Sequence, residues 1–153
     1  MNPAPLTCAE LLEAMPQAPP FRFVDRVLEV DRSSIRATYR FREDESYYLG
    51  HFPGQPITPG VILLECMAQC GVVLHGLYLL SLEGNHFQVR THRTLLTDAS
   101  IEWLASVYPG ETVVVSGAVR TWRRQRIRSG VEMRKASGER VAVGEIGGMG
   151  VRI

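Results

Sequence analysis

The residues best suited to do chemistry in this sequence are a histidine in a proline- and glycine-rich segment and a glutamate shortly after it. His51 opens a segment that holds three prolines and two glycines up to Gly60, and Glu65 lies in the apolar run that follows. An imidazole can accept a proton near neutral pH, and apolar surroundings favour the protonated form of a carboxyl group. The pair therefore predicts an acid/base site, with His51 as the base and Glu65 as the acid. Taken singly, His51 could be a structural turn residue and Glu65 a solvent-reaching one.

The residues around this pair could complete the site. Pro59 suits the first position of a helix, which would leave the N–H groups of Gly60 and Val61 free at the positive end of the helix dipole. Such donors stabilise the negative charge that develops on a carbonyl oxygen during a reaction. Gln69 follows Glu65 by one helical turn, so its amide is expected to orient the carboxyl group.

These residues depend on a long apolar helix for their positions. Val61 to about Leu82 carries apolar side chains on nearly every face, so the helix must be wrapped by other structure. Its length would also suit a membrane span, but Glu65, Gln69 and His75 would be costly in lipid, and we expect no membrane contact.

The structure that covers this helix is predicted to be a β-sheet. Thr7 and Glu10 have the spacing of a capping box, which predicts a short helix before Pro16. Runs typical of strands occupy residues 21–30, 34–41, 87–96, 99–107, 112–128, 130–136 and 140–153. The sequence leaves open whether the first two runs are neighbours. We expect a single α+β domain over residues 1–153, with a long central helix wrapped by a curved antiparallel sheet.

Composition excludes several other classes. With 17 basic and 16 acidic residues the net charge is +1, so the whole molecule has no field that would recruit nucleic acid or an anionic membrane. Cys8, Cys66 and Cys70 form neither an even disulfide framework nor a paired metal-ligand set, which favours small buried thiols in a reducing compartment. The first residues lack the basic and apolar regions of a secretory signal, so we expect a cytoplasmic protein.

The central motif resembles a known family. His51-Phe52-Pro53-Gly54-x-Pro56-x-x-Pro59-Gly60-Val61, with Glu65 and Met67-Ala68-Gln69 after it, resembles the hot-dog-fold 3-hydroxyacyl-(acyl carrier protein) dehydratases of the glutamate-bearing FabZ type. The stretch from Pro20 to Val27 is similar to that family's first strand, and Val107-Tyr108-Pro109-Gly110-Glu111 is similar to its V-x-P-G-D/E turn. The resemblance covers most of the chain and implies the hot-dog fold.

The resemblance also implies a mechanism. His51 would remove the α-proton of a 3-hydroxyacyl thioester, Glu65 would protonate the departing hydroxyl, and Gly60 would bind the thioester carbonyl. Ile57 would orient the imidazole through its own carbonyl. No metal and no redox cofactor is implied. The pathway would be fatty-acid synthesis or a polyene or polyketide type of biosynthesis.

The family's partners are implied as well. The working histidine and glutamate would come from different subunits of a homodimer, with assembly of such dimers into a hexamer left open, and the substrate would arrive on an acyl carrier protein. An arginine cluster could dock that acidic partner, although a solvated sheet face and nucleic-acid binding are the alternatives; we expect no nucleic acid. Its members are Arg120, Arg123, Arg124, Arg126 and Arg128, four of which would share one face of a single strand.

Two segments depart from the family's pattern. Ile101 to Ser106 lacks the basic residues and the proline expected before the V-x-P-G turn, and the connection from Ser81 to Leu96 is longer than usual. Both departures bear on how the carrier and the acyl chain would bind. Two other functions stay open: a hot-dog acyl thioesterase, in which Glu65 would activate water or attack the thioester, and a non-catalytic partner subunit of an active homologue.

Overall fold

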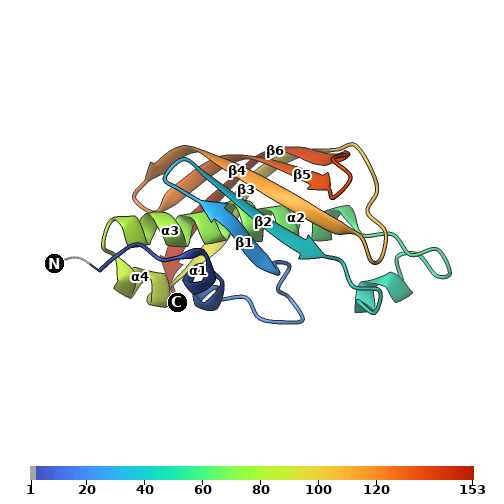
Figure 1. Ribbon diagram of the computed structural model, residues 1–153, viewed down its shortest axis with the longest axis horizontal. Helices are drawn as coiled ribbons and strands as arrows, with labels where there is room; N and C mark the ends of the chain where they lie inside the picture. The colour runs from blue at the N-terminus through green and yellow to red at the C-terminus, as the bar shows by residue number, and fades with distance from the viewer. Residues whose placement is uncertain (1–2) are drawn as a thin grey trace.

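A six-stranded antiparallel sheet wraps one long helix in this protein (Figure 1). The structure is a computed structural model and describes residues 3–153. The strand order is β1-β2-β4-β5-β6-β3, which leaves β1 and β3 as the two edges. The strands are β1 (Arg26–Val30), β2 (Ser34–Arg40), β3 (His92–Trp103), β4 (Thr112–Arg123), β5 (Arg126–Lys135) and β6 (Arg140–Arg152). The helix wrapped by a curved antiparallel sheet is the arrangement predicted from the sequence.

The first two strands form a hairpin, a pairing that the sequence left open. Thr38 of β2 lies opposite Arg26 of β1. Asp31 closes the turn between them, because its Oδ1 accepts hydrogen bonds from the N–H groups of Ser33 (2.8 Å) and Ser34 (2.9 Å). An aspartate that bonds to the backbone two residues on is a turn former in its own right.

The central helix runs from Gly60 to Leu82 in three parts. These are α2 (Gly60–Ala68), a π-helical turn labelled η2 (Gln69–Val73) and α3 (Leu74–Leu82). By length and composition the helix could cross a membrane, with a mean hydropathy of 1.6, but 72% of its most apolar stretch is buried inside the protein. The sheet therefore covers it, as expected for a core helix.

Helix and sheet touch backbone to backbone at one point. A Cβ atom placed on Gly117 of β4 would lie 2.6 Å from the carbonyl oxygen of Gly71 in the π-helical turn. No side chain fits in that space. Glycine at both positions lets the helix lie directly on the sheet.

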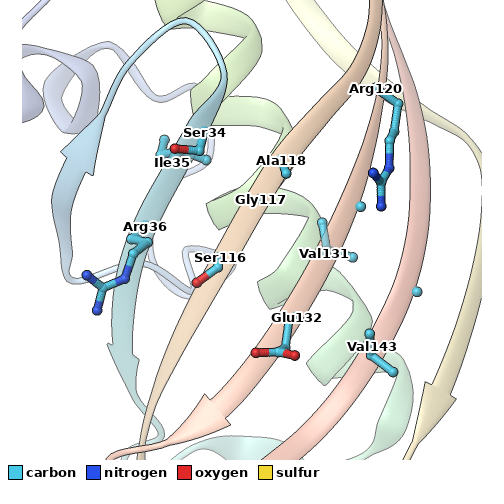
Figure 2. Close-up of a pocket in the computed structure, with 12 residues that line it drawn as sticks. Ser34, Ile35, Arg36, Ser116, Gly117, Ala118, Arg120, Val131, Glu132 and Val143 are labelled. Carbon is cyan, nitrogen blue, oxygen red and sulfur yellow. The ribbon is translucent and has the colours of Figure 1, made fainter.

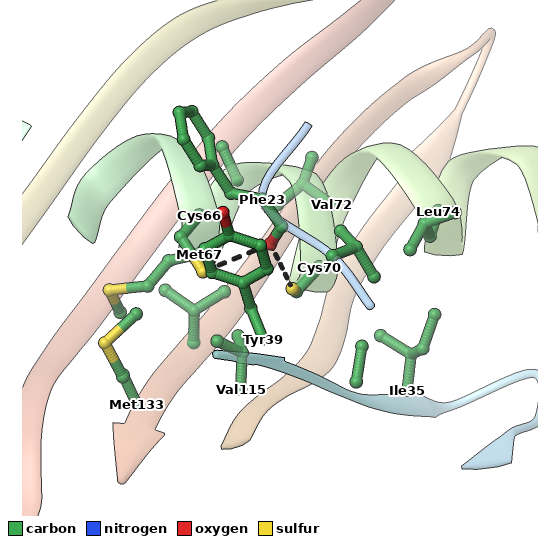
Figure 3. Packing of buried hydrophobic residues seen from close by; sticks show 14 of the residues in the cluster. Phe23, Ile35, Tyr39, Cys66, Met67, Cys70, Val72, Leu74, Val115 and Met133 are labelled. Atoms are coloured by element: carbon green, nitrogen blue, oxygen red, sulfur yellow. Dashed lines mark hydrogen bonds between the residues drawn. The ribbon is translucent and has the colours of Figure 1, made fainter. Parts of the chain in front are cut away.

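Buried cysteines add polar contacts to this core. Cys66 and Cys70 are fully buried, and both thiols donate to the carbonyl oxygen of Phe23, at 3.4 and 3.5 Å (Figure 3). All three cysteines are free thiols, and Cys8 is partly exposed. Burial raises the pKa of the Cys66 thiol well above its ordinary value, so Cys66 is held as the unreactive thiol that the sequence predicted.

The predicted N-terminal helix is confirmed as α1 (Cys8–Ala14). Its capping box is complete, because Glu10 N–H donates to the Thr7 hydroxyl (3.3 Å) and Thr7 N–H donates to the Glu10 carboxylate (2.8 Å). Leu11 is fully buried and fixes the inner face of α1. The helix lies beside α3 (Figure 1), where Leu6 N–H donates to the Ser81 hydroxyl at 3.1 Å.

Three strand predictions were wrong. The run over residues 87–96 begins as a short helix, α4 (His86–Thr91), and β3 starts only at His92. The run over residues 99–107 is not a strand of its own, because β3 continues through it and ends at Trp103. Gly84, with φ of 76°, ends the central helix just before α4, and Val89 turns inward to the core. The run over residues 112–128 is not one strand either, because Arg124 and Gln125 both take left-handed conformations and fold it into the β4–β5 hairpin. Tight hairpin turns usually carry Asn-Gly or Asp-Gly, and Arg124-Gln125 matches neither pattern, so this turn could not be predicted from the sequence.

Candidate active site

The His51 segment is a rigid loop between a 3-10 helix (Ser46–Leu49) and α2. Ile57 N–H donates back to the carbonyl oxygen of His51 (2.9 Å), and Thr58 N–H donates to Val107 in the distant turn (2.9 Å). The buried hydroxyls of Tyr48 and Thr58 lie 2.6 Å apart and share a hydrogen bond. The loop is thus closed on itself and tied to the 3-10 helix before it and to the segment between β3 and β4.

Ile57 also fixes the imidazole, as the family resemblance implied. The His51 Nδ1 lies 2.9 Å from the Ile57 carbonyl oxygen. A carbonyl oxygen can only accept, so Nδ1 carries the proton and Nε2 keeps its lone pair. His51 is partly exposed, and its ring stacks on that of Phe52 with a centroid distance of 4.1 Å. The histidine is therefore held in the tautomer of a general base at Nε2.

The start of α2 presents free donors. Pro59 precedes the first residue of the helix, and no backbone acceptor within residues 3–153 contacts the N–H of Gly60 or of Val61. Trp103, at the end of edge strand β3, covers this helix start: its Nε1–H donates to the Gly60 carbonyl oxygen at 3.2 Å. A Cβ on Gly60 would lie 3.2 Å from that nitrogen, so the position favours glycine.

Glu65 and Gln69 meet as predicted. The Gln69 Nε2 donates to Glu65 Oε1 at 2.8 Å and to the Phe21 carbonyl oxygen at 3.0 Å. Its Oε1 accepts from Phe23 N–H at 2.7 Å, which fixes the orientation of the amide. Gln69 is fully buried while Glu65 is partly exposed. One oxygen of the carboxyl group is therefore held by the helix, and the other is available to a ligand.

Glu65 lines a small cavity of about 40 Å³ between the central helix and strands β3 and β6. The residues that line it are Gln17, Glu65, Ala68, Val72, Val73, Thr94, Leu96, Ile146, Gly147 and Gly148. His51 is not among them. Within one chain the predicted base and acid thus do not share a cavity.

Two larger hollows lie elsewhere. One of about 730 Å³ is bounded by the segment from Pro19 to Asp25, by Tyr47 and by Ile62. The other, of about 310 Å³, lies on the outer face of the sheet, where the small residues Ser116 and Ala118 leave it shallow (Figure 2). Neither contains His51 or Glu65, so size alone does not locate the chemistry.

The arginine cluster does not form the single face predicted from the sequence. Because the chain reverses at Arg124, the five arginines divide between a hairpin tip and the outer face of the sheet. Arg128 is held by Asp98 (2.8 Å) and Glu145 (3.6 Å), and Arg120 lies across Gly130. Arg123, Arg124 and Arg126 stay at the tip, exposed.

Two site residues were missed by sequence reasoning. Trp103 lies in the Ile101–Ser106 segment that departs from the family's pattern, and nothing in its neighbourhood of the sequence points to Gly60. Gln17 follows the first helix and carries no motif, yet it lines the Glu65 cavity. Both contacts join segments far apart in the chain. Among residues 3–153, no group of three or more histidine, cysteine, aspartate or glutamate side chains could hold a metal ion.

Comparisons with known proteins identify the family of this chain. A model of the FabA-like domain matches residues 15–146. The 3-hydroxyacyl-(acyl-carrier-protein) dehydratase FabZ of Thermus thermophilus is 34% identical over 125 residues, which cover 75% of this chain and 77% of that protein. The enzyme of the same name from Erwinia tasmaniensis is 46% identical over 70 residues, covering 45% of this chain and 46% of that protein.

Solved structures share the fold at low identity. The dehydratase heterocomplex ApeI:P of Xenorhabdus doucetiae superposes with a TM-score of 0.71 at 14% identity, covering 93% of this chain and 91% of that one. A thioesterase from Pseudomonas aeruginosa superposes with a TM-score of 0.69 at 9% identity, covering 97% and 96%. The predicted hot-dog fold is thereby confirmed.

Proposed function

The chain belongs to the FabA-like domain family, and from this premise we propose that it is a dehydratase acting on 3-hydroxyacyl thioesters bound to an acyl carrier protein. The products are a trans-2-enoyl thioester and water. This reaction belongs to fatty-acid biosynthesis or a related assembly of acyl chains, and we place the enzyme in the cytoplasm.

The reaction assigns one task to each residue of the site. His51 removes a proton from C2 of the substrate through Nε2, and the N–H groups of Gly60 and Val61 donate to the thioester oxygen as negative charge gathers there. The carboxyl group of Glu65 gives its proton to the C3 hydroxyl as the C3–O bond breaks. The electrons of the C2–H bond form the new double bond, and water leaves.

The observation that carries this proposal is the way the two side chains are held. The Ile57 carbonyl oxygen lies 2.9 Å from Nδ1 of His51, which leaves only Nε2 free to take a proton. The Gln69 amide holds one oxygen of Glu65 at 2.8 Å. Such orientation is what general acid/base catalysis requires.

The separation of His51 from the Glu65 cavity supports a shared site in a homodimer. β3 is an edge strand, and its residues from Leu95 to Ser100 are exposed. Leu96 lines the Glu65 cavity and is itself 53% exposed. We propose that two copies pair at this edge, so that His51 of the partner subunit faces Glu65. Further assembly into a hexamer remains a prediction from the family resemblance.

The hairpin tip suits the acidic carrier. Arg123, Arg124 and Arg126 form no ion pair within residues 3–153. The end of β6 lies against this tip, where Gly150 N–H donates to Gln125 (2.9 Å), and it brings up the exposed Arg152. A group of unpaired arginines at one end of a chain with a net charge of only +1 favours an acidic partner. We propose this tip, rather than the four-arginine strand face expected from the sequence, as the carrier's docking point.

One assay tests the function. The protein is incubated with a 3-hydroxyacyl carrier protein, and intact mass is followed. Loss of 18 Da, the mass of one water, supports the dehydratase. Release of the free carrier thiol would instead identify a thioesterase, a fold relative of which is known from Pseudomonas aeruginosa. Binding without any mass change would identify a non-catalytic partner subunit.

A further inference from the structure

Trp103 makes a contact with the start of α2 that the proposed mechanism does not use. The residue is 47% exposed at the end of edge strand β3, so water could satisfy its indole N–H. The Nε1–H nevertheless donates to the Gly60 carbonyl oxygen at 3.2 Å. The direction of the indole therefore calls for an explanation other than burial of the ring.

The Gly60 carbonyl group does not need this donor. Gly60 is the first residue of α2, and Leu64 lies four positions further along the same helix. In an α-helix the N–H at that position is the ordinary partner of the carbonyl oxygen. The oxygen has a second lone pair, which is the one available to the indole. Trp103 thus adds a hydrogen bond to a carbonyl that the helix itself can satisfy.

The same peptide group carries the N–H of Val61, which has no backbone acceptor within residues 3–153. A peptide group is planar, so a bond that fixes its carbonyl also fixes the direction of its N–H. Donation to the oxygen also polarises the group, and hydrogen bonds that follow one another in a chain strengthen each other. Trp103 therefore orients the Val61 N–H and makes it a stronger donor.

The end of β3 that carries the indole is itself held in place. Trp103 lies opposite Ala142 of β6, and the next N–H, that of Leu104, donates to the Val141 carbonyl oxygen at 2.7 Å. Ala142 and Val141 are both fully buried. The ring rests against Gly60, where a Cβ atom would lie 3.2 Å from Nε1 and 3.3 Å from Cε2. The donor is thus fixed by its backbone and by its neighbour, as a positional task requires.

We propose that Trp103 is a positioning residue for dehydration: its indole N–H orients and polarises the peptide group between Gly60 and Val61, whose N–H donates to the thioester oxygen. The proposal rests on the function proposed above. When His51 removes the C2 proton, negative charge gathers on the thioester oxygen. A donor that is already aligned and polarised stabilises that charge more than it stabilises the neutral carbonyl of the bound substrate.

The test replaces Trp103 with phenylalanine, which keeps an aromatic ring and removes the donor. We expect kcat to fall about five- to tenfold, roughly the value of one hydrogen bond, with KM for the 3-hydroxyacyl carrier protein unchanged. Trp122→Phe is the matched control, because the Trp122 Nε1–H also donates to a protein oxygen, Glu83 Oε1 at 2.5 Å, but at the other end of the central helix. The control is expected to keep the wild-type kcat.

Vibrational spectroscopy supplies a readout that a merely structural role would not move. A saturated acyl carrier protein labelled with ¹³C at the thioester carbonyl binds without reacting, and hydrogen bonds to its oxygen lower the frequency of the carbonyl stretch. With Trp103→Phe that frequency is expected to rise, and with Trp122→Phe it is expected to equal the wild-type value.

A second variant covers the case in which Trp103→Phe does not fold. Trp122→Phe leaves Trp103 as the single tryptophan, so growth with benzothienylalanine exchanges only its N–H group for sulfur. An unchanged kcat or an unchanged carbonyl frequency in a folded protein that lacks this N–H would overturn the proposal. Failure of the wild type to release water from 3-hydroxyacyl carrier proteins would overturn the proposed function instead, and the carbonyl frequency would still show whether Trp103 polarises the peptide group.

Discussion

Replacement of Gln69 by leucine probes the contact on which the acid of the site depends. The change keeps the approximate volume of the side chain and removes its amide. Three hydrogen bonds are lost, one each to Glu65, to the Phe21 carbonyl and from Phe23 N–H. Phe23 is 1% exposed, so its N–H is left buried without a partner, whereas Phe21 is 51% exposed and its carbonyl can turn to water.

The magnitude follows from this difference in exposure. An unpaired buried N–H costs about 1–3 kcal/mol, and each of the two contacts that water can replace contributes roughly 0.5–1.5 kcal/mol. We therefore expect the free energy of unfolding to fall by about 2–6 kcal/mol. For a chain of this size that corresponds to a drop of roughly 4–24 °C in Tm. The loss in kcat should be larger than tenfold, since Glu65 is no longer oriented.

Urea and thermal unfolding, monitored by circular dichroism at one fixed protein concentration, measure the change in the free energy of unfolding and in Tm. A fixed concentration is needed because an oligomer's stability depends on it. Gln88→Leu serves as the control, because the Gln88 Oε1 has no hydrogen-bond partner to lose within residues 3–153. Ordinary surface substitutions change the free energy of unfolding by up to about 0.5 kcal/mol. If Gln69→Leu differs from the wild type by no more than that, the hydrogen bonds of Gln69 do not stabilise the fold.

Three further predictions address other parts of the molecule. His51→Ala and Glu65→Gln should each lower kcat by about two orders of magnitude or more while circular dichroism shows the fold intact, and near-normal turnover in either would remove that residue from the mechanism. Burial lowers the pKa of His75, so below about pH 6.5 the unfolded chain binds a proton more readily than the native one. The free energy of unfolding measured by urea titration should therefore fall from about pH 7 to about pH 5.5, and it should fall less steeply with pH in His75→Gln. An unchanged dependence on pH in that variant would contradict this prediction. Gly117→Ala should cost about 1–3 kcal/mol, because its Cβ would lie 2.6 Å from the Gly71 carbonyl oxygen, and a variant as stable as the wild type would mean that the helix moves away freely.

Local chemistry in the sequence was enough to predict the elements that bear the site. Each of these predictions involves residues within four positions of one another: the helix start at Pro59-Gly60, the hydrogen bond across one helical turn between Glu65 and Gln69, and the capping box at Thr7. Such contacts follow from helix geometry alone. The wrapped helix could also be predicted, because a helix that is apolar on every side but carries Glu65, Gln69 and His75 must be covered by other parts of the protein.

The parts that could not be predicted depend on contacts across the sheet or on unusual backbone conformations. Arg124 and Gln125 reverse the chain although neither residue type favours a left-handed conformation. The sequence pattern therefore predicted one strand over residues 112–128. Gln17 and Trp103 reach the site only after β3 has been placed against α2. Periodicity in one strand carries no information on its neighbours, which is why the arginines were assigned to a single face.

The π-helical turn from Gln69 to Val73 has a consequence for how this chain tolerates length changes. A π turn accommodates one residue more than an α-helix would in the same place, and such turns are frequent at functional sites. Deleting one residue there would restore a regular helix and keep Leu74 and Leu77, now buried, on the side that packs into the core. A further inserted residue has no such turn to absorb it, and it would rotate everything after it by about 100° relative to α2. The chain should therefore tolerate the loss of one residue in this turn better than the gain of one.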